Sequence, residues 1–540
     1  MYSSFVFPRQ SLTPGIQPTL VSSHSMSRMN VNVNVNVLPI ANVRYLFTSS
    51  PASYNTPFKN QDNPYAHTIP TILSSMEETS KKIHTPPRFR VLMFPWLAHG
   101  HISPFLELSK RLAKNNFQIY FCSTEVNLNF INKNKTLDEY FSDHSMELVL
   151  LDLPDMPELP RHNHTTKNLP LHLKSTLKIV FYMGKTNFQN ILNTLKPDLL
   201  IYDVFQPWAS ELAALNHIPS VHFVTCGAVN MSFFYHCLKY GFSGFNETYP
   251  FPSIFMRDYE INRMAAIAQG SSTIEPQEAQ LSPKCFELSS DIILVKSWRG
   301  IEGKYIDHLS LSCGKKVLAL GPLHEPEDDT KEEENNSHII KFLNTKDQSS
   351  VVYVSFGSEY FLSQEEREEM AYGLELSNAY FIWVIRFPVG NAITLEEALP
   401  EGFLERVKER GLVVNGWAPQ VKILGHPSTG GFVSHCGWNS VIESIYYGVP
   451  LLALPMLYDQ FINARLAVEI GVGIEILKDE DGQIKRDEVT KVINKVVVEK
   501  KEGELQREKA RELTKKLREE GEGELLEAVE KLRLLCSKNK

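Results

Sequence analysis

The sequence predicts an α/β protein with two open, doubly wound parallel sheets, one in each half of the chain. Short apolar runs alternate with amphipathic segments from residue 89 onward, and the alternation restarts after an acidic stretch at 325–337. The length of 540 residues also exceeds that of a usual single domain. In this pattern each apolar run is a strand, and each amphipathic segment is the helix that crosses to the next strand.

Residues 1–75 differ in composition from the rest of the chain. They are rich in Ser, Thr, Asn and Pro and hold a single acidic residue, Asp62. This composition is typical of an organelle transit peptide. Met76 is an equally good start, in which case the extension is an artefact of gene prediction. We therefore expect a disordered or transit-like extension, with both origins open.

The first half of the folded chain begins with the apolar run FRVLMF at 89–94, which predicts a first strand. Ser103 and Pro104 are typical of a helix N-cap and a first helical position, so we expect a helix to begin there. Two further strands are expected where DLLIYD follows Pro197 and VHFVT follows Pro219.

The second half follows the acidic, proline-containing stretch at 325–337, which predicts an exposed linker. We expect strands at 351–357, 380–386, 412–417, 430–436, 450–455 and 473–476, helices at 364–377, 438–448 and 460–470, and a charged amphipathic helical region that packs on the rest from about residue 486. The expected parts are the extension 1–75, a first domain 84–322, the linker 323–337, a second domain 338–510 and a helical region 511–540.

Charge and cysteine content exclude several classes of protein. The net charge of −8 gives no general field to attract nucleic acid or anionic lipid. The seven cysteines are scattered and form no Cys-x-x-Cys, which argues against a disulfide framework or a zinc knuckle and favours a reducing compartment. No apolar run approaches the roughly 20 residues of a membrane-spanning helix.

An anion site is predicted where the strand at 430–436 meets the helix that begins at Trp438. The N-terminus of that helix presents free backbone N–H groups and a positive dipole end. Gly437 allows close backbone approach, and His435 and Ser440 add hydrogen-bond donors. These features suit a diphosphate, and Glu443, one turn later, suits the hydroxyls of a ribose.

Trp417 ends the strand before this site and precedes Ala418, Pro419 and Gln420. An exposed indole face at that position could hold a planar base. The alternative is a core aromatic residue.

The 44-residue segment from Trp417 to Gln460 resembles, without a gap, the signature box of the plant UDP-dependent glycosyltransferases of secondary metabolism, family 1. The resemblance covers about residue 89 to the end and implies the two-domain GT-B fold, with two Rossmann-like domains facing across a cleft. It implies a UDP-sugar donor as co-substrate, no cofactor and no metal, with the acceptor bound by the N-terminal domain and the donor by the C-terminal domain.

The resemblance also implies roles for individual donor-binding residues. By this likeness, Trp417 stacks on the uracil, Ala418 and Gln420 hold the base and ribose, and Glu443 takes the ribose hydroxyls. The diphosphate falls to His435, Asn439, Ser440 and Ser358, and the sugar to Trp438, Asp459, Gln460 and Thr225.

The catalytic pair is expected in the first domain. His101 lies in the loop AHGHISP, and a neutral imidazole there can take a proton near neutral pH. The run from Gly100 to Pro104 is similar to the family's Gly-His-x-x-Pro, which implies that His101 is the base and that Asp203 fixes its tautomer. His99 and His101 form a His-x-His pair, but no third ligand is identifiable, so we expect no metal there.

The expected enzyme is an inverting UDP-sugar-dependent hexosyltransferase. The resemblance of PWLAHGHISPFLEL and FGSEYFLSQEE to one subgroup implies a sugar-sugar bond formed on a flavonoid or terpenoid glycoside, and Gln460 makes UDP-glucose the default donor. Direct glucosylation of a phenolic or terpenoid aglycone is the alternative, and a non-catalytic nucleotide-sugar binder a remote one. We expect a cytoplasmic monomer without nucleic acid or membrane span, or a plastid protein if 1–75 is a transit peptide.

Overall fold

The computed structural model describes residues 88–133, 137–167, 169–240, 248–270, 281–321, 323, 337–388 and 393–538. The predicted extension at 1–75 lies outside the described residues, as does the acidic linker except for Ser337.

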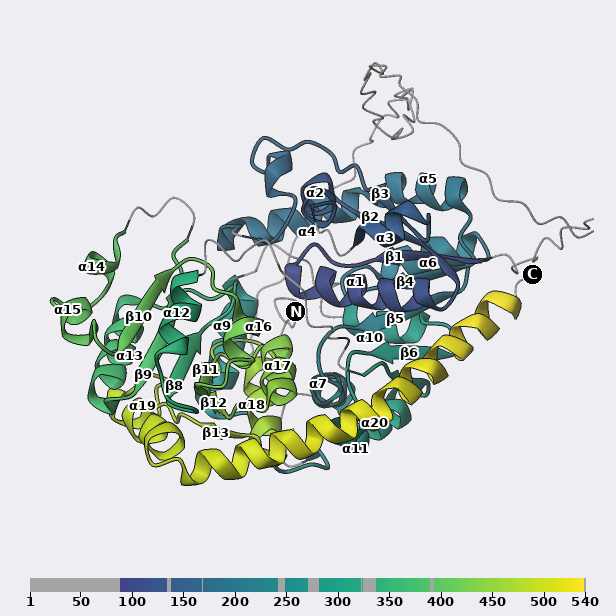
Figure 1. Cartoon of the computed structure of the whole chain (residues 1–540). Coiled ribbons are helices and arrows are strands. Elements are labelled where there is room, and N and C mark those ends of the chain that lie inside the picture. The colour runs from purple at the N-terminus through teal and green to yellow at the C-terminus, as the bar shows by residue number, and fades with distance from the viewer. Residues whose placement is uncertain are drawn as a thin grey trace, which may run out of the picture. The chain divides into compact units, whose positions relative to one another are not determined.

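The first sheet is wholly parallel, with strand order β3-β2-β1-β4-β5-β6-β7 (Figure 1). Its central strands are apolar on both faces, as expected for a sheet covered by helices on both sides. Along the first strand, Val91 and Met93 enter one buried cluster, whereas Leu92 and Phe94 enter another. The strands are β1 Phe89–Phe94, β2 Phe117–Ser123, β3 Met146–Leu150, β4 Leu199–Tyr202, β5 Ser220–Val224, β6 Ile292–Val295 and β7 Lys316–Ala319.

The helices of the first half cover both faces of this sheet. They are α1 His99–Lys114, α2 Glu125–Ile131, α3 Asp138–Ser142, η2 Arg161–Asn163, η3 Leu171–Leu173, α4 Lys174–Met183, α5 Lys185–Leu195, α6 Pro207–Leu215, α7 Ala228–Tyr240, α9 Asp258–Gly270, α10 Leu281–Leu288 and α11 Arg299–Cys313. Apolar residues of α1 pack in the cluster with Val91, and those of α5 and α6 in the cluster with Leu92.

The start of α1 corrects the sequence prediction. The helix begins at His99 rather than after Ser103, so Ser103 is not the N-cap and Pro104 lies inside the helix. The backbone N–H groups of His101 and Ile102 both donate to the Ala98 carbonyl at 2.9 Å and close the first turn. A proline has a helical φ and lacks only its own N–H, so Pro104 removes one bond without ending the helix.

The second sheet is also parallel, with order β10-β9-β8-β11-β12-β13. Its strands lie where the apolar runs predict them, each one to three residues shorter. They are β8 Val351–Ser355, β9 Tyr380–Ile385, β10 Gly411–Asn415, β11 Thr429–Ser434, β12 Leu451–Ala453 and β13 Gly473–Glu475.

The helices of the second half include one whose bounds agree fully with the prediction, α13. Ser363 caps it through a capping box with Glu366, which explains why the sequence marks this start so clearly. The helices are α12 Ser337–Asn344, α13 Gln364–Ser377, α14 Leu395–Ala398, α15 Phe403–Val407, α16 Gln420–Leu424, α17 Trp438–Tyr447, α18 Gln460–Glu469, α19 Arg486–Ile493, η5 Asn494–Val498 and α20 Lys501–Lys538.

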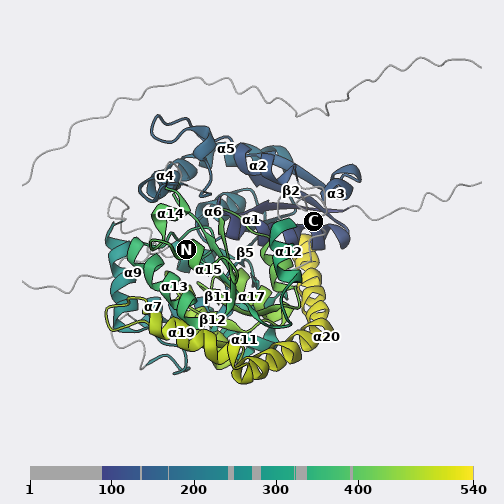
Figure 2. The same cartoon turned by 60° about the vertical axis from the view of Figure 1, so that its left-hand side comes forward.

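The helix α20 connects the two halves, and with α19 and η5 it makes the chain helical from Arg486, as expected. Its first part packs against α17 through Leu513 and Leu517, and its last part joins the cluster of the first sheet through Leu525 and Leu532 (Figures 1 and 2). The predicted packing role of this charged region is thereby confirmed. A single buried cluster also contains side chains of α7 and α11 together with those of α17 and α18.

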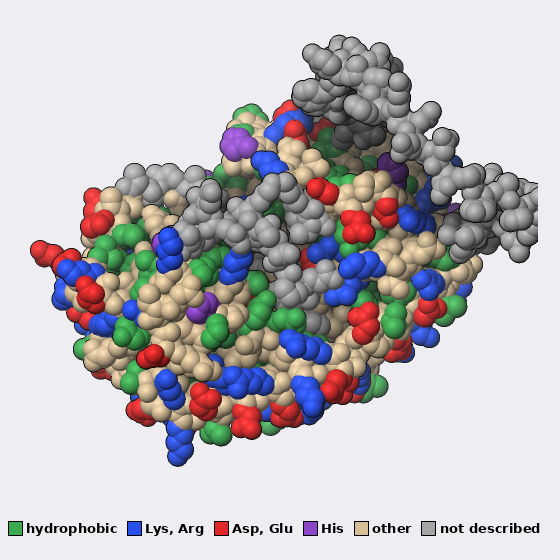
Figure 3. Space-filling model, viewed as in Figure 1, with side chains coloured by type: hydrophobic (Ala, Val, Ile, Leu, Met, Phe, Trp, Pro, Cys, Tyr) green, Lys and Arg blue, Asp and Glu red, His purple; other side chains and the backbone are tan. Residues whose placement is uncertain are grey.

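The surface and the cysteines agree with the composition. On the face in Figure 3, basic and acidic side chains are interspersed rather than sorted into one patch of either sign. The seven cysteines, all among the described residues, form no disulfide bond, as predicted. Within the described residues, no helix is long and apolar enough to cross a membrane.

Candidate active site

His101 stands in the first turn of α1, at the carboxyl edge of the first sheet, rather than in the preceding loop. Its Nδ1 lies 2.7 Å from Oδ2 of Asp203, which follows β4, the strand next to β1. The structure therefore brings together the two residues of the predicted pair, 102 positions apart in the chain.

Asp203 is fully buried and held by several donors. Its Oδ2 accepts the backbone N–H of Trp96 at 3.0 Å, and its Oδ1 accepts that of Val204 at 2.7 Å. Burial raises the pKa of this carboxyl, but His101 and the two backbone N–H groups lower it by more, so the net shift of the pKa is downward. An ionised carboxylate only accepts, so Nδ1 of His101 carries a proton and Nε2 is left as the basic nitrogen.

Thr225 lies on the catalytic pair. Its Oγ1 is 3.1 Å from the same His101 Nδ1, and the residue is buried at the end of β5. The hydroxyl, expected near the sugar of the donor, thus contacts the imidazole of the expected base. It steadies the imidazole together with Asp203.

Phe205 is an aromatic residue beside this pair. Its ring centroid lies 6.2 Å from that of His101, although the residue is itself buried. Trp208, Phe233 and Phe234 are buried core residues as well.

The predicted anion site forms at the turn between β11 and α17. Cys436 turns the chain with φ of 64°, a left-handed conformation that is uncommon outside glycine. A Cβ added at Gly437 would lie 2.7 Å from Nε2 of His435, and one at Gly357 would lie 2.5 Å from it. Both glycines thus make room for the His435 ring at the N-terminus of α17. Desolvation lowers the pKa of His435 to about 4, so the ring is neutral at neutral pH.

The base and ribose residues form a network on the second sheet. Nε2 of Gln420 donates to Oγ of Ser440 at 3.1 Å and to Oε2 of Glu443 at 2.8 Å. The Trp417 side chain beside them is 59% exposed, whereas Ala418 is buried. An exposed indole next to an ordered carboxylate supports the interpretation as a stacking platform over that as a core residue.

Trp438 and Asn439 contact the first half of the chain. The indole Nε1 of Trp438 donates to the carbonyl of Lys296 at 2.7 Å, and the residue is buried. Nζ of Lys296 donates to Oδ1 of Asn439 at 2.6 Å. The indole N–H of Trp438 is therefore used in the contact between the halves.

The last residues of the box lie at the start of α18. Oε1 of Gln460 accepts the backbone N–H groups of Met456 and Leu457 at 3.0 and 2.8 Å, which leaves its amide nitrogen for a ligand. Oδ2 of Asp459 accepts from Nδ2 of Asn463 at 3.3 Å. Both side chains are thus oriented by their own loop.

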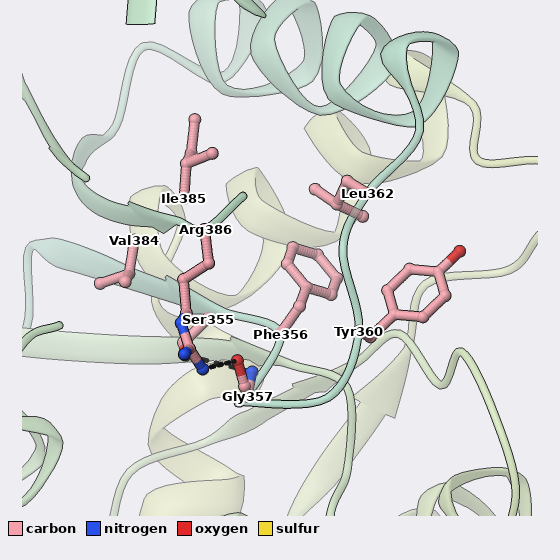
Figure 4. A pocket seen from close by; sticks show the side chains of 8 residues that line it. All are labelled: Ser355, Phe356, Gly357, Tyr360, Leu362, Val384, Ile385 and Arg386. Carbon is pink, nitrogen blue, oxygen red and sulfur yellow. Dashed lines mark hydrogen bonds between the residues drawn. The ribbon is translucent and has the colours of Figure 1, made fainter. Parts of the chain in front are cut away.

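Ser358 lies in the turn after β8, next to Gly357. The Arg386 guanidinium donates to the Gly357 carbonyl at 3.3 Å, across a cavity of about 20 Å³ (Figure 4). This volume has room for about one water molecule and none for a nucleotide. We interpret Arg386 as a brace for the turn that carries Ser358.

Glu359 links the acid–base pair to the anion site. Its carboxylate, 42% exposed, accepts from Oγ1 of Thr166 at 3.4 Å and pairs with Nζ of Lys174 at 3.5 Å, both in the first half. Desolvation raises its pKa, but the charge of Lys174 and, more weakly, that of His101 give a net downward shift. The charge of the same carboxylate opposes the desolvation that lowers the pKa of His435.

Sequence reasoning missed Lys296, Glu359, Lys174 and Glu302. Glu302 is fully buried and accepts the backbone N–H groups of Ala228 and Val229, at the start of α7. The signals available were a lysine directly after the apolar run IILV and an acidic residue after SFGS. Each is unusual for its place, but neither reveals its partner.

Among the described residues, no three His, Cys, Asp or Glu side chains are grouped to hold a metal ion.

Comparison with known proteins agrees with this geometry. The model of a glycosyltransferase N-terminal domain matches residues 88–325, and that of "UDP-glucoronosyl and UDP-glucosyl transferase" matches residues 328–505. A Mogroside IIIx synthase of Siraitia grosvenorii is 51% identical over 81% of this chain and 96% of its own. A beta-D-glucosyl crocetin beta-1,6-glucosyltransferase of Gardenia jasminoides is 49% identical over 76% of this chain and 90% of its own.

Among solved structures, that of TcCGT1 in complex with UDP superposes with a TM-score of 0.67 at 26% identity. It covers 84% of this chain and 100% of its own. The paired parallel sheets are thus the GT-B fold that the resemblance implied. Because it is 51% identical to a relative over 81% of its length, the chain belongs to the plant UDP-dependent glycosyltransferases and is a hexosyltransferase enzyme.

Proposed function

We propose that the enzyme transfers glucose from UDP-glucose to a hydroxyl of a sugar that is already attached to a small plant metabolite. Two observations support this proposal: the His101–Asp203 pair at the carboxyl edge of the first sheet, and the tight turn at Cys436 and Gly437 that opens the N-terminus of α17. One group can take a proton while the other holds a leaving diphosphate.

In the proposed reaction, Nε2 of His101 takes the proton of the acceptor hydroxyl as the oxygen bonds to the anomeric carbon. The bond from that carbon to the diphosphate oxygen breaks on the opposite face, so an α-linked donor gives a β product. Asp203 stabilises the imidazolium that forms. The N-terminus of α17, with Asn439 and Ser440, meets the charge that develops on the departing UDP.

Two features support a glycoside as acceptor. One relative is named for its action on a glucosylated crocetin, with a β-1,6 linkage to be formed. Around His101 the chain also presents Glu359, Lys174 and Thr166, polar groups of the kind that hydrogen-bond sugar hydroxyls. A direct transfer to an aglycone would need only the apolar side, where Phe205 lies.

The test is a screen of UDP-sugars against flavonoid and terpenoid acceptors, each as aglycone and as monoglucoside, with products identified by mass spectrometry and NMR. We expect a second hexose linked β to the first sugar. Products formed only from aglycones would contradict the acceptor assignment, and a preference for another UDP-sugar would contradict the donor assignment.

His101→Ala tests the base. We expect the turnover number to fall by about 10³-fold or more while the Kd for UDP stays within about twofold, because the imidazole acts on the acceptor proton. His99→Ala is the matched control, since His99 shares the first turn of α1 and contacts Phe130 instead of Asp203. Equal losses in both variants would refute the assignment.

We also propose a cytoplasmic, monomeric enzyme. The seven unpaired cysteines support a reducing compartment. Light scattering on the purified full chain tests the monomer.

A further inference from the structure

Lys296 joins the two halves of the enzyme at the donor site. It follows β6 at the carboxyl edge of the first sheet, and its residue is only 6% exposed. Its carbonyl accepts the indole N–H of Trp438 at 2.7 Å, and its Nζ donates to Oδ1 of Asn439 at 2.6 Å. Both partners are the first two residues of α17, the helix whose N-terminus is the anion site.

The contact fixes which way the Asn439 amide points. An ammonium group can only donate, so the side of the amide that faces Lys296 must be the oxygen. The Nδ2 group is then directed away from the lysine. An amide donor with fixed orientation at a helix N-terminus suits an anionic oxygen.

The charges around Lys296 explain why an ammonium is retained in a buried place. Glu443 and Glu107 are the acidic groups that act on it. Each already has another donor, since Gln420 binds Glu443 and Lys110 pairs with Glu107 at 2.6 Å. Desolvation is the largest influence and lowers the pKa of Lys296 to about 8. A buried cation with only shared counterions gains from an arriving diphosphate.

We propose that Lys296 is a positioning residue for the diphosphate of the donor: it holds the Asn439 amide in its binding orientation and adds a positive charge from the opposite half of the enzyme. The inference rests on the proposed UDP-sugar site. By this inference, both halves of the enzyme contribute residues to the donor site, although the signature box lies wholly in the second half.

The experiment compares the affinities of UDP, UMP and uridine by calorimetry or ligand-observed NMR. In Lys296→Met, which keeps the length of the side chain, we expect UDP to bind about 10- to 100-fold more weakly, the usual effect of losing a hydrogen bond to a charged group. The Kd for uridine should change less than about twofold. Lys296→Arg should recover at least part of the UDP affinity.

Lys315→Met is the matched control. Its ammonium also donates hydrogen bonds, to the backbone carbonyls of Glu287 and Ser289, but it precedes β7 at the opposite edge of the same sheet. This variant should bind UDP like the wild type. Equal weakening of UDP and uridine in Lys296→Met, or no weakening of either, would overturn the inference.

A double variant separates positioning from a general charge effect. If Lys296 acts through Asn439, then Lys296→Met should cost less UDP affinity in an Asn439→Ala background than alone. Full additivity would overturn the positioning role. A wild-type enzyme that binds UDP but transfers no sugar to glycosides would refute the proposed acceptor and leave this inference standing, whereas a wild type that does not bind UDP would refute both.

Discussion

The acid–base pair and the donor site are built in different ways. His101, Asp203 and Thr225 follow strands β1, β4 and β5, which are neighbours in one sheet, and they bond to one another at 2.7 and 3.1 Å. The donor site is divided. Gln420, Ser440 and Glu443 form a network within the second sheet, whereas Trp438 and Asn439 are held by Lys296 from the first.

This difference teaches that a catalytic unit and a binding unit can be separated within one enzyme, except where the two halves meet. Variants in the first sheet should alter the chemical step and leave UDP affinity unchanged. Variants in the second should do the reverse. Lys296 is one exception, because it belongs to the first half and serves the donor, and Glu302 is another.

The largest effect is expected from Asp203→Asn. The asparagine keeps the shape but cannot hold Nδ1 of His101 protonated or stabilise the imidazolium, so the turnover number should fall by about 10²- to 10⁴-fold. The Kd for UDP should stay within about twofold of that of the wild type. Steady-state kinetics and calorimetry measure the two quantities separately.

Asp198→Asn is the control for that variant. Asp198 precedes the same strand β4 and accepts the backbone N–H of Arg90 at 2.7 Å, at the opposite edge of the sheet. Its replacement should lower stability and spare turnover. If Asp203→Asn also keeps the turnover number of the wild type, Asp203 is not part of a catalytic pair. The proposed catalytic unit in the first sheet would then be refuted.

A smaller and opposite effect is expected from Trp417→Ala. Stacking of a base on an aromatic side chain contributes about 1–3 kcal/mol, so the Kd for UDP should rise by about 10- to 100-fold. The turnover number at saturating donor should change by less than about threefold. Trp417→Phe keeps a stacking face and should retain most of the affinity. An unchanged Kd in Trp417→Ala would show that the exposed indole does not bind the base.

The sequence predicts most strands because their signal is local. Runs such as those of β1 and β9 are apolar over most of their length, and a strand buried on both faces needs no other information. The start of α1 was missed for a local reason as well: Ser103 and Pro104 match a helix start, yet the Ala98 carbonyl begins the helix a turn earlier. The structure thereby moves His101 from a loop into a helix.

In the candidate site, too, the residues within one continuous stretch were predicted, and those that depend on distant contacts were missed. Residues within the 44-residue box were found through its resemblance to the family's signature, which is one continuous stretch of sequence although it spans α16, β11, α17 and β12. Lys296 was missed because its partner Asn439 lies 143 positions away, and Glu359 because Thr166 lies 193 positions away. Contacts over such separations depend on how two sheets pack, which no short pattern records.

The smallest effect is expected from a change at Glu302, which lies where the catalytic unit and the binding unit meet. Its carboxylate supports the segment that follows Thr225, where Gly227 is so close that an added Cβ would meet the Trp438 ring at 3.1 Å. Glu302→Gln should therefore lower the turnover number and UDP affinity together, each by less than about tenfold, because it loosens a support shared by His101 and Trp438.

The pKa of Glu302 also predicts how the stability of the enzyme changes with pH. Desolvation raises the pKa of Glu302 from 4.5 to about 7, against three hydrogen bonds that lower it. Between pH 4.5 and about pH 7, Glu302 has lost its proton in the unfolded chain but still holds it in the folded chain. Its contribution to the free energy of unfolding is therefore complete below pH 4.5 and is lost as the pH rises through 7. Glutamine does not titrate. The difference in Tm between the wild type and Glu302→Gln should thus shift by a few degrees against the wild type from pH 5 to pH 8, as scanning calorimetry can measure. A difference that stays constant with pH would mean that the carboxylate remains ionised at the junction, and that its hydrogen bonds to the start of α7 outweigh its burial.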